Sequence, residues 1–223
     1  MSKLFIIPTP IGNLDDISFR VIHLLKTLDI ILAEDTRRTK KIFSHYEIHN
    51  KIECFHSHNE HKKLDRYINK LKLGDQVGLV SDAGTPGISD PGFLLVRECI
   101  RVGIEVICIP GPTAFIPALI TSGIPCDRFV FEGFLPLKKG RKKRLAELST
   151  EKRTIIFYES PHRIIKTLGD LSNYFGLDRI ASISREISKM YEETNRGTIK
   201  DLLCHFKQQS PKGEFVIVLS GLK

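Results

Sequence analysis

The sequence predicts an α/β protein of two domains, and three observations support this prediction. Short β-branched runs alternate with amphipathic segments, loops rich in Gly and Pro follow several of the runs, and a Gly-Ile-Pro turn at 123–125 separates two such series. This alternation is typical of βαβ units around a mostly parallel sheet. We therefore expect domains at residues 1–122 and 123–223, with a ligand site in the cleft between them.

The elements of the first domain follow from periodicity and from helix-end signals. Leu64, Ile68 and Leu71 share one helical face, and Gly74-Asp75 provides a stop after them. Asp90-Pro91 is predicted to be a helix N-cap followed by a proline in the first turn. Pro110-Gly-Pro112 is expected to begin a helix in the same way. The predicted strands are 4–7, 30–33, 51–55, 76–81 and 105–109, and the predicted helices are 19–28, a basic stretch after 33, 59–73, and 91 to about 103.

The second domain shows the same mixture of short apolar runs and amphipathic segments. Strands are expected at 129–132, 154–158, 180–184 and 214–219, with helices near Leu145 and at 164–174 and 199–208.

Composition places the chain among globular proteins and points to a charged partner. Of 223 residues, 41% are apolar and 27% are charged, which is sufficient for a buried core. The formal net charge is +8. Residues 122–223 carry 19 Lys and Arg against 12 Asp and Glu, whereas residues 1–121 carry 15 against 14. A basic half favours a polyanionic partner such as nucleic acid, although a solvated basic surface would have the same composition.

The cysteines and the apolar runs predict a cytoplasmic protein without a membrane segment. Five cysteines without a C-x-x-C pair suggest buried free thiols in a reducing compartment. The apolar run before Pro8 is too short for a signal peptide. The uncharged stretch 106–126 is interrupted by prolines and glycines, so a buried strand, turn and helix are expected there. The cysteines are Cys54, Cys99, Cys108, Cys126 and Cys204.

Four loops after predicted strands contain the residues that suggest a ligand site; they are 8–14, 33–37, 81–92 and 110–114. Open α/β sheets bind ligands at the carboxyl ends of their strands. Glycine lets the backbone approach a ligand, and neighbouring carboxylates suit a ribose or an ammonium group. Each loop alone could be only a tight turn. The sequence lacks the G-x-G-x-x-G fingerprint, the P-loop and a serine nucleophile elbow, so neither dinucleotide nor nucleoside triphosphate chemistry is supported.

Nine segments along the whole chain match one family in order. The sequence resembles the bacterial 16S ribosomal RNA (cytidine) 2′-O-methyltransferases, a branch of the tetrapyrrole methylase superfamily. The twelve-residue loop at 81–92 makes the match specific. The segments are PTPIGNLDDI (8–17), AEDTRRT (33–39), HNE (58–60), SDAGTPGISDPG (81–92), PGPTA (110–114), GFLP (133–136), FYESPHR (157–163), REISK (185–189) and GEFVIV (213–218).

The resemblance implies a two-domain tetrapyrrole-methylase-like fold, usually dimeric, that binds S-adenosylmethionine in the interdomain cleft without a metal. It also implies 16S ribosomal RNA as the substrate, within the small ribosomal subunit. Relatives that methylate tetrapyrroles have a glycine-rich first loop, whereas here the loop is PTPIGN, which points towards the RNA branch. The cofactor residues implied by the resemblance are Pro10, Ile11, Gly12, Asp82, Thr85, Pro86, Thr113, Ala114 and Phe134.

Methylation of a ribose oxygen is expected to proceed by in-line displacement, which benefits from aligned reactants and a general base. Glu34 and Asp35 follow a predicted strand and could supply this base, although such a pair could equally cap the next helix. Glu159 and His162 are the rival candidates.

A basic run at 138–144 is the predicted RNA-binding segment. It places six Lys or Arg residues in seven positions, and contacts from such side chains to phosphates would give affinity that falls with salt. An exposed loop without a partner is the alternative. The substrate-binding candidates are Lys138, Lys139, Arg141, Lys142, Lys143, Arg144, Arg37 and Arg163, with Arg38 as a further candidate.

Three alternatives remain open from the residues. The histidines at 56, 58 and 61 resemble a metal cluster in composition, but their spacing is not regular for a helix. A small-molecule methylase of the tetrapyrrole type would use the same fold without needing the basic run. A non-catalytic RNA-binding module would explain the charge but would leave the four loops unused.

Overall fold

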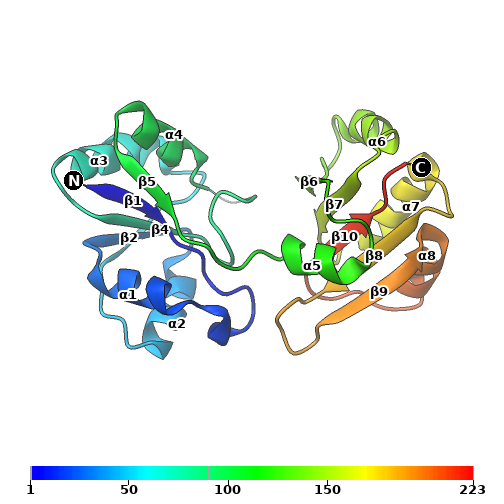
Figure 1. Cartoon of the computed structure of the whole chain (residues 1–223), viewed down its shortest axis with the longest axis horizontal. Helices are drawn as coiled ribbons and strands as arrows, with labels where there is room; N and C mark the ends of the chain where they lie inside the picture. Colours follow the sequence, from blue (N-terminus) through cyan, green and yellow to red (C-terminus); the bar gives the residue numbers. More distant parts are fainter. Residues whose placement is uncertain (1, 90, 223) are drawn as a thin grey trace. The chain divides into compact units, whose positions relative to one another are not determined.

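The structure, a computed structural model, describes residues 2–89 and 91–222 and divides the chain into two compact units, Met1–Thr113 and Ala114–Lys223. Each unit is built on a five-stranded sheet (Figure 1). The sequence predicted the boundary after residue 122, but it lies before helix α5 (Phe115–Ser122), because this helix packs on strands of the second sheet. Gly123 ends α5 in the left-handed conformation and is not part of a linker.

The first unit is a parallel sheet with helices on both faces. Its strand order is β3-β2-β4-β1-β5, and every neighbouring pair is parallel, as predicted. The elements are β1 (Lys3–Ile6), α1 (Phe19–Thr27), β2 (Ile30–Ala33), α2 (Thr36–His45), β3 (Ile52–Cys54), α3 (Glu60–Lys72), β4 (Val77–Val80), α4 (Phe93–Arg101) and β5 (Glu105–Cys108), with a short 3-10 helix at Leu14–Asp16.

Alternation of side chains along β2 explains why all four of its residues are buried. Ile30 and Leu32 join the core formed with α3 and α4, whereas Ile31 and Ala33 join the core formed with α1 and α2. Successive side chains of a strand point to opposite faces, so a central strand covered by helices on both sides is apolar throughout.

Two helix starts differ from the sequence prediction. Helix α4 begins at Phe93 with Gly92 as its N-cap, so Pro91 does not occupy the first turn, and Asp90 lies outside the described residues. Helix α5 begins at Phe115, after the Pro110-Gly-Pro112 segment rather than at it. Pro91-Gly92 and Pro110-Gly-Pro112 both lie in loops at the carboxyl edge of the first sheet.

The second unit has a mixed sheet, of order β6-β7-β10-β8-β9. Only β6 and β7 are parallel, and the other neighbouring pairs are antiparallel, so the predicted parallel arrangement holds for the first unit alone. The elements after α5 are β6 (Phe129–Phe134), α6 (Arg141–Ser149), β7 (Thr154–Glu159), α7 (Ile164–Phe175), β8 (Ile180–Arg185), β9 (Glu193–Thr198), α8 (Ile199–Lys207) and β10 (Phe215–Leu219).

Helices cover both faces of this sheet as well. Ile155 and Phe157 of β7 point into the core with α6, α7 and α8, whereas Ile156 and Tyr158 point towards α5. Strand β9 was not predicted. Its sequence, ETNRGT, contains no apolar residue, and it forms the edge of the sheet by backbone pairing with β8.

Two further findings bear on the sequence predictions. Of the cysteines predicted to be buried, Cys99 is buried and Cys54 is half-buried, but Cys108, Cys126 and Cys204 are exposed. Among the described residues, no helix combines the length and apolar character needed to cross a membrane.

Candidate active site

Loops from four strand ends meet at the carboxyl edge of the first sheet. The loops at 8–12 and 81–86 are joined by two backbone hydrogen bonds of 2.9 Å, one in each direction between Thr9 and Gly84. The Thr9 hydroxyl also donates to the carbonyl of Ser81, at 3.2 Å. Thr9 is 1% exposed, so this junction is part of the core rather than a flexible contact.

The fourth loop, at 110–113, packs tightly against the other two. A methyl group at Gly111 would lie 2.2 Å from Cγ of Pro8, so only glycine permits this approach. The Thr85 hydroxyl donates to the carbonyl of Pro112, at 3.0 Å. Gly84 has a left-handed φ of +77°, and a side chain there would lie 3.3 Å from Ile11. Predicted cofactor residues from three loops are therefore brought together within one unit.

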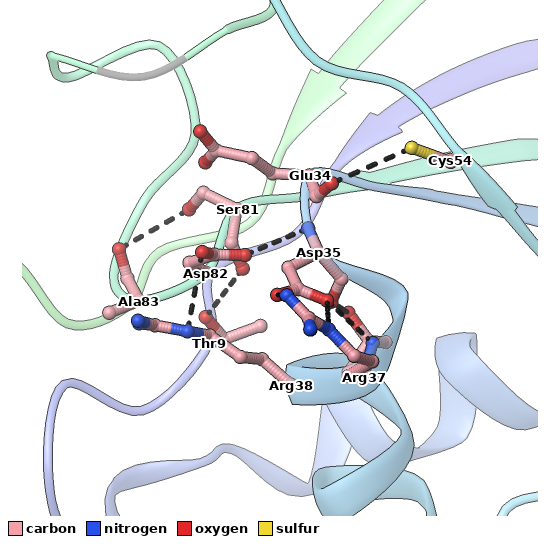
Figure 2. Close-up of polar contacts among 10 residues, drawn as sticks. Thr9, Glu34, Asp35, Arg37, Arg38, Cys54, Ser81, Asp82 and Ala83 are labelled. Carbon is pink, nitrogen blue, oxygen red and sulfur yellow. Dashed lines mark hydrogen bonds and ion pairs between the residues drawn. The ribbon is translucent and has the colours of Figure 1, made fainter.

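Asp82 fixes the loop after β2 (Figure 2). One of its carboxylate oxygens accepts a hydrogen bond of 2.9 Å from the backbone amide of Asp35, and the other lies 3.4 Å from Nε of Arg38. The Asp82 carboxylate thus connects the ends of two neighbouring strands, β2 and β4, which orients the pair Glu34 and Asp35.

Asp35 caps helix α2. Its side chain accepts the backbone N–H of Arg37 at 2.9 Å and pairs with the Arg37 guanidinium at 2.7 Å. These hydrogen bonds lower the pKa of Asp35 to about 2. A carboxylate whose pKa is this low binds a proton only weakly, so Asp35 is a poor general base. Arg37, a predicted RNA contact, is held in the same pair.

Glu34 has the opposite environment. Burial and the negative charge of Asp82 raise its pKa above the ordinary value, and the smaller effects of the Asp82 backbone amide, Arg38 and His56 lower it. Its carboxylate points away from the Asp35–Arg37 pair in Figure 2. Of the two adjacent carboxylates, Glu34 is therefore the better proton acceptor.

Glu159 in the second unit forms a buried ion pair. It is 2% exposed, and its two oxygens accept hydrogen bonds from the guanidinium of Arg163 (2.8 and 3.1 Å), from the Thr167 hydroxyl (2.6 Å) and from the Ser160 amide (2.8 Å). These contacts give Glu159 and Arg163 a structural role, in place of the catalytic and substrate-binding roles expected from the sequence. The rival His162 is exposed.

The basic run separates into two groups. Arg141 is buried, at 7% exposed, and pairs with Asp170 at 2.8 Å, while Arg144 pairs with Glu132. Arg141 is therefore buried rather than exposed to RNA, contrary to the prediction, whereas Arg144 is ion-paired but partly exposed. The lysines are exposed and form no ion pair within 2–89 and 91–222; they are Lys138, Lys139, Lys142 and Lys143.

The remaining candidates lie at loop ends. Phe134 is the last residue of β6 and is 53% exposed. The centroid of its ring lies 5.7 Å from the centroid of the Tyr158 ring. Thr113 closes the first unit, and Ala114 is the N-cap of α5 in the second. The rings of His56 and His58 lie 5.8 Å apart, and the described residues contain no group of three His, Cys, Asp or Glu arranged to hold a metal ion.

Sequence reasoning missed several contacts of these residues. Gly84 and Gly111 were within the predicted loops, but their close contacts depend on the tertiary structure. A signal for Arg141 and Arg144 was present, because they share a helical face with the buried leucines of α6, Leu145 and Leu148. No signal pointed to Thr167, which lies in the middle of α7.

Comparisons with known proteins agree on one family. The profile of the tetrapyrrole (corrin/porphyrin) methylases matches residues 3–203. Two relatives, from Synechocystis sp. and Thermotoga maritima, are both named ribosomal RNA small subunit methyltransferase I. The first is 48% identical, covering 99% of this chain and 80% of that protein. The second is 46% identical and covers 99% of both.

Solved structures share the fold at low sequence identity. The methyltransferase CobJ matches with a TM-score of 0.73 and 17% identity, over 99% of this chain and 95% of that one. A uroporphyrin-III C-methyltransferase from Thermus thermophilus, complexed with S-adenosylhomocysteine, matches with a TM-score of 0.66 and 16% identity over 97% of both chains.

Proposed function

Because the chain belongs to the tetrapyrrole methylase family, we propose that it transfers a methyl group from S-adenosylmethionine to a cytidine ribose 2′-hydroxyl in 16S ribosomal RNA. The observation that carries this proposal is the interlocked set of loops at the carboxyl edge of the first sheet. Similarity over 99% of this chain to relatives named as small-subunit ribosomal RNA methyltransferases supports the substrate.

The residues at these loops suit the cofactor. Gly84 and Gly111 have no side chains, so the backbones of neighbouring loops lie close together there. Main-chain groups rather than side chains are therefore presented at these two positions. The carboxylates of Glu34 and Asp82 provide negative charge for a ligand that carries a sulfonium and an ammonium group. The cofactor residues of this proposal in the first unit are Pro10, Ile11, Gly12, Asp82, Thr85, Pro86 and Thr113.

Glu34 acts as the general base in this proposal. The bound cofactor supplies an electrophilic methyl group on a positively charged sulfur. Glu34 accepts the proton that the ribose hydroxyl loses, as the new oxygen–carbon bond forms and the sulfur–carbon bond breaks. Its raised pKa improves it as an acceptor relative to Asp35, whose pKa is about 2. Asp82 holds the backbone of Asp35 and so keeps Glu34 in place.

The exposed lysines of the basic run supply contacts to the RNA backbone. Lys138 and Lys139 precede α6, and Lys142 and Lys143 lie on its outward face. Such contacts position an RNA without reading its sequence. We also propose that the protein acts as a homodimer in the cytoplasm, on RNA within the small ribosomal subunit.

Transfer of a labelled methyl group tests this function. Small ribosomal subunits from a strain lacking the enzyme should accept label in the presence of S-adenosylmethionine, whereas a corrin precursor should not. Label in the corrin precursor alone would favour the small-molecule methylase. Absence of transfer to either acceptor, with RNA binding retained, would favour the non-catalytic binding module.

A further inference from the structure

Helix α2 begins two residues after Glu34 and carries a concentration of positive charge. Its sequence, TRRTKKIFSH, has four cations at positions 37–41 and no acidic residue. Thr39, Ile42 and Phe43 form the buried face of the helix, and Phe43 packs in the same core as residues of α1. The cations therefore lie on the sides of α2 that do not enter the core.

The two arginines of α2 have acidic partners at the candidate site. Arg38 reaches back to the loop after β4, where its Nε lies 3.4 Å from a carboxylate oxygen of Asp82 (Figure 2). Arg37 pairs with Asp35 at 2.7 Å, but this pair lies at the surface and 87% of the Arg37 side chain is exposed. Arg38 therefore belongs to the loop junction, whereas Arg37 remains open to a ligand.

The two lysines of α2 lack such partners. Lys40 and Lys41 are exposed and form no ion pair with any residue that the structure describes. They follow Arg37 by three and four residues, so the three cations share one side of the helix. We call Arg37, Lys40 and Lys41 the α2 basic face. It lies within the first two turns of the helix, at the end that follows Glu34.

The charge pattern of α2 opposes the stability of the helix. Negative charge stabilises a helix N-terminus and positive charge a C-terminus. Helix α3 follows this rule, with Glu60 in its first turn and Lys70 and Lys72 in its last. Helix α2 reverses it, because Arg37 and Arg38 lie in the first turn without an acidic residue, and like charges three and four residues apart also repel. A bound polyanion would neutralise this repulsion, whereas water alone leaves it in place.

Helix α6, which carries the basic run, shows the same reversal. Its first turn consists of cations and contains no acidic residue. In α6, as in α2, the arginines pair with acidic side chains and the lysines are exposed. The two helices with this pattern thus lie one in each unit.

We propose that the α2 basic face binds RNA phosphates next to the nucleotide whose ribose reaches Glu34. The inference rests on the proposed function, because it takes RNA as the substrate and Glu34 as the base. Contacts to phosphates position an RNA segment without reading its sequence. Since α2 and Glu34 belong to the same unit, the phosphate contacts and the base are held together by one sheet and its loops.

Replacing Lys40 and Lys41 together by Ala tests the inference, and replacing Lys62 and Lys72 together by Ala is the matched control. The control removes the same charge from exposed positions of α3, which covers the other face of the same sheet. Binding of the α2 variant to small ribosomal subunits that lack the modification should weaken by about tenfold, within the range for two exposed ion pairs. The dependence of log K on log salt should flatten by about 0.7–0.9 for each lost contact. The control should keep the wild-type Kd and salt slope.

Charge reversal separates loss of binding from loss of stability. Replacing Lys40 and Lys41 together by Glu places carboxylates three and four residues after Arg37, and opposite charges at these spacings stabilise a helix. Tm should therefore equal or exceed that of wild type. Subunit binding should nevertheless be weaker than in the alanine variant, because the new charges repel phosphates.

The outcomes distinguish this inference from the proposed function. Wild-type protein that neither binds the subunits nor transfers a methyl group to them would overturn both. If wild-type protein does both, and the two α2 variants keep its Kd and salt slope, the inference alone is overturned. Equal weakening in the α2 and α3 alanine variants would also overturn it, because net charge rather than the α2 basic face would then determine the affinity.

Discussion

At the scale of single residues, two adjacent carboxylates receive opposite properties from their surroundings. Asp35 caps a helix and pairs with Arg37, so its pKa falls to about 2. Glu34 is partly buried near Asp82, so its pKa rises above 4.5. The sequence placed both after a strand but could not separate them, because the difference depends on Asp82, which is distant in the sequence.

Replacement of Glu34 by Gln should reduce methyl transfer by roughly 10²- to 10⁴-fold, the usual contribution of a general base. Single-turnover transfer at saturating cofactor measures this effect, and Asp35→Asn is the matched control, expected to lose much less. Equal losses in the two variants would show that Glu34 is not the base.

The pH dependence of transfer follows from the same assignment. A base acts when deprotonated, so activity should rise with pH through the pKa of Glu34, and the midpoint should lie above 4.5 because that pKa is raised. The pH profile of kcat in wild-type protein provides the measurement. A midpoint near 2 would point to Asp35 instead.

Gly111 provides a test of the loop junction. Gly111→Ala places a methyl group 2.2 Å from Cγ of Pro8, so the loops must separate, at a cost of about 1–3 kcal/mol in unfolding free energy and with weaker cofactor binding. Gly169→Ala in α7 is the control: it meets no atom within 4 Å and should be neutral or stabilising by about 0.5–1 kcal/mol. Unchanged denaturant unfolding and unchanged cofactor affinity in Gly111→Ala would contradict the junction.

At the scale of elements, periodicity predicted the buried strands and the amphipathic helices, and it failed where local signals compete with tertiary structure. Strand β9 has no apolar residue and exists because β8 offers it a partner. Helix α4 begins at Phe93 and α5 at Phe115, because the Pro-containing segments before them form loops that follow β4 and β5. A turn signal at Gly123 proved to be a helix end rather than a domain boundary.

The basic run 138–144 contains two ion-paired arginines and four exposed lysines, and the role of the lysines in RNA binding can be tested. Replacing Lys138, Lys139, Lys142 and Lys143 together by Ala should weaken RNA binding and flatten the dependence of log K on log salt, by about 0.7–0.9 for each phosphate that the variant no longer binds. Cofactor Kd should not change, because these side chains are exposed and contribute to no ion pair among the described residues. Identical salt slopes for wild type and variant would show that the RNA surface lies elsewhere.

At the scale of the whole molecule, the sequence predicted two α/β units and the uneven charge between the halves of the chain. It could predict that the loops meet at one sheet edge, since the carboxyl ends of parallel strands share an edge. Composition could not show that Arg141 is buried and Arg144 is ion-paired while the neighbouring lysines are exposed, because this depends on the face of α6 that is buried.

Nucleoside analysis of the reaction product tests the central claim most directly. Small ribosomal subunits lacking the modification are incubated with S-adenosylmethionine and either wild-type protein or Glu34→Gln, and their 16S RNA is digested to nucleosides for mass spectrometry. The proposed function predicts one new 2′-O-methylcytidine per RNA with wild-type protein, and a strongly reduced yield with Glu34→Gln. A methyl group on a base, or no methylated nucleoside from wild-type protein that binds both cofactor and subunit, would contradict it.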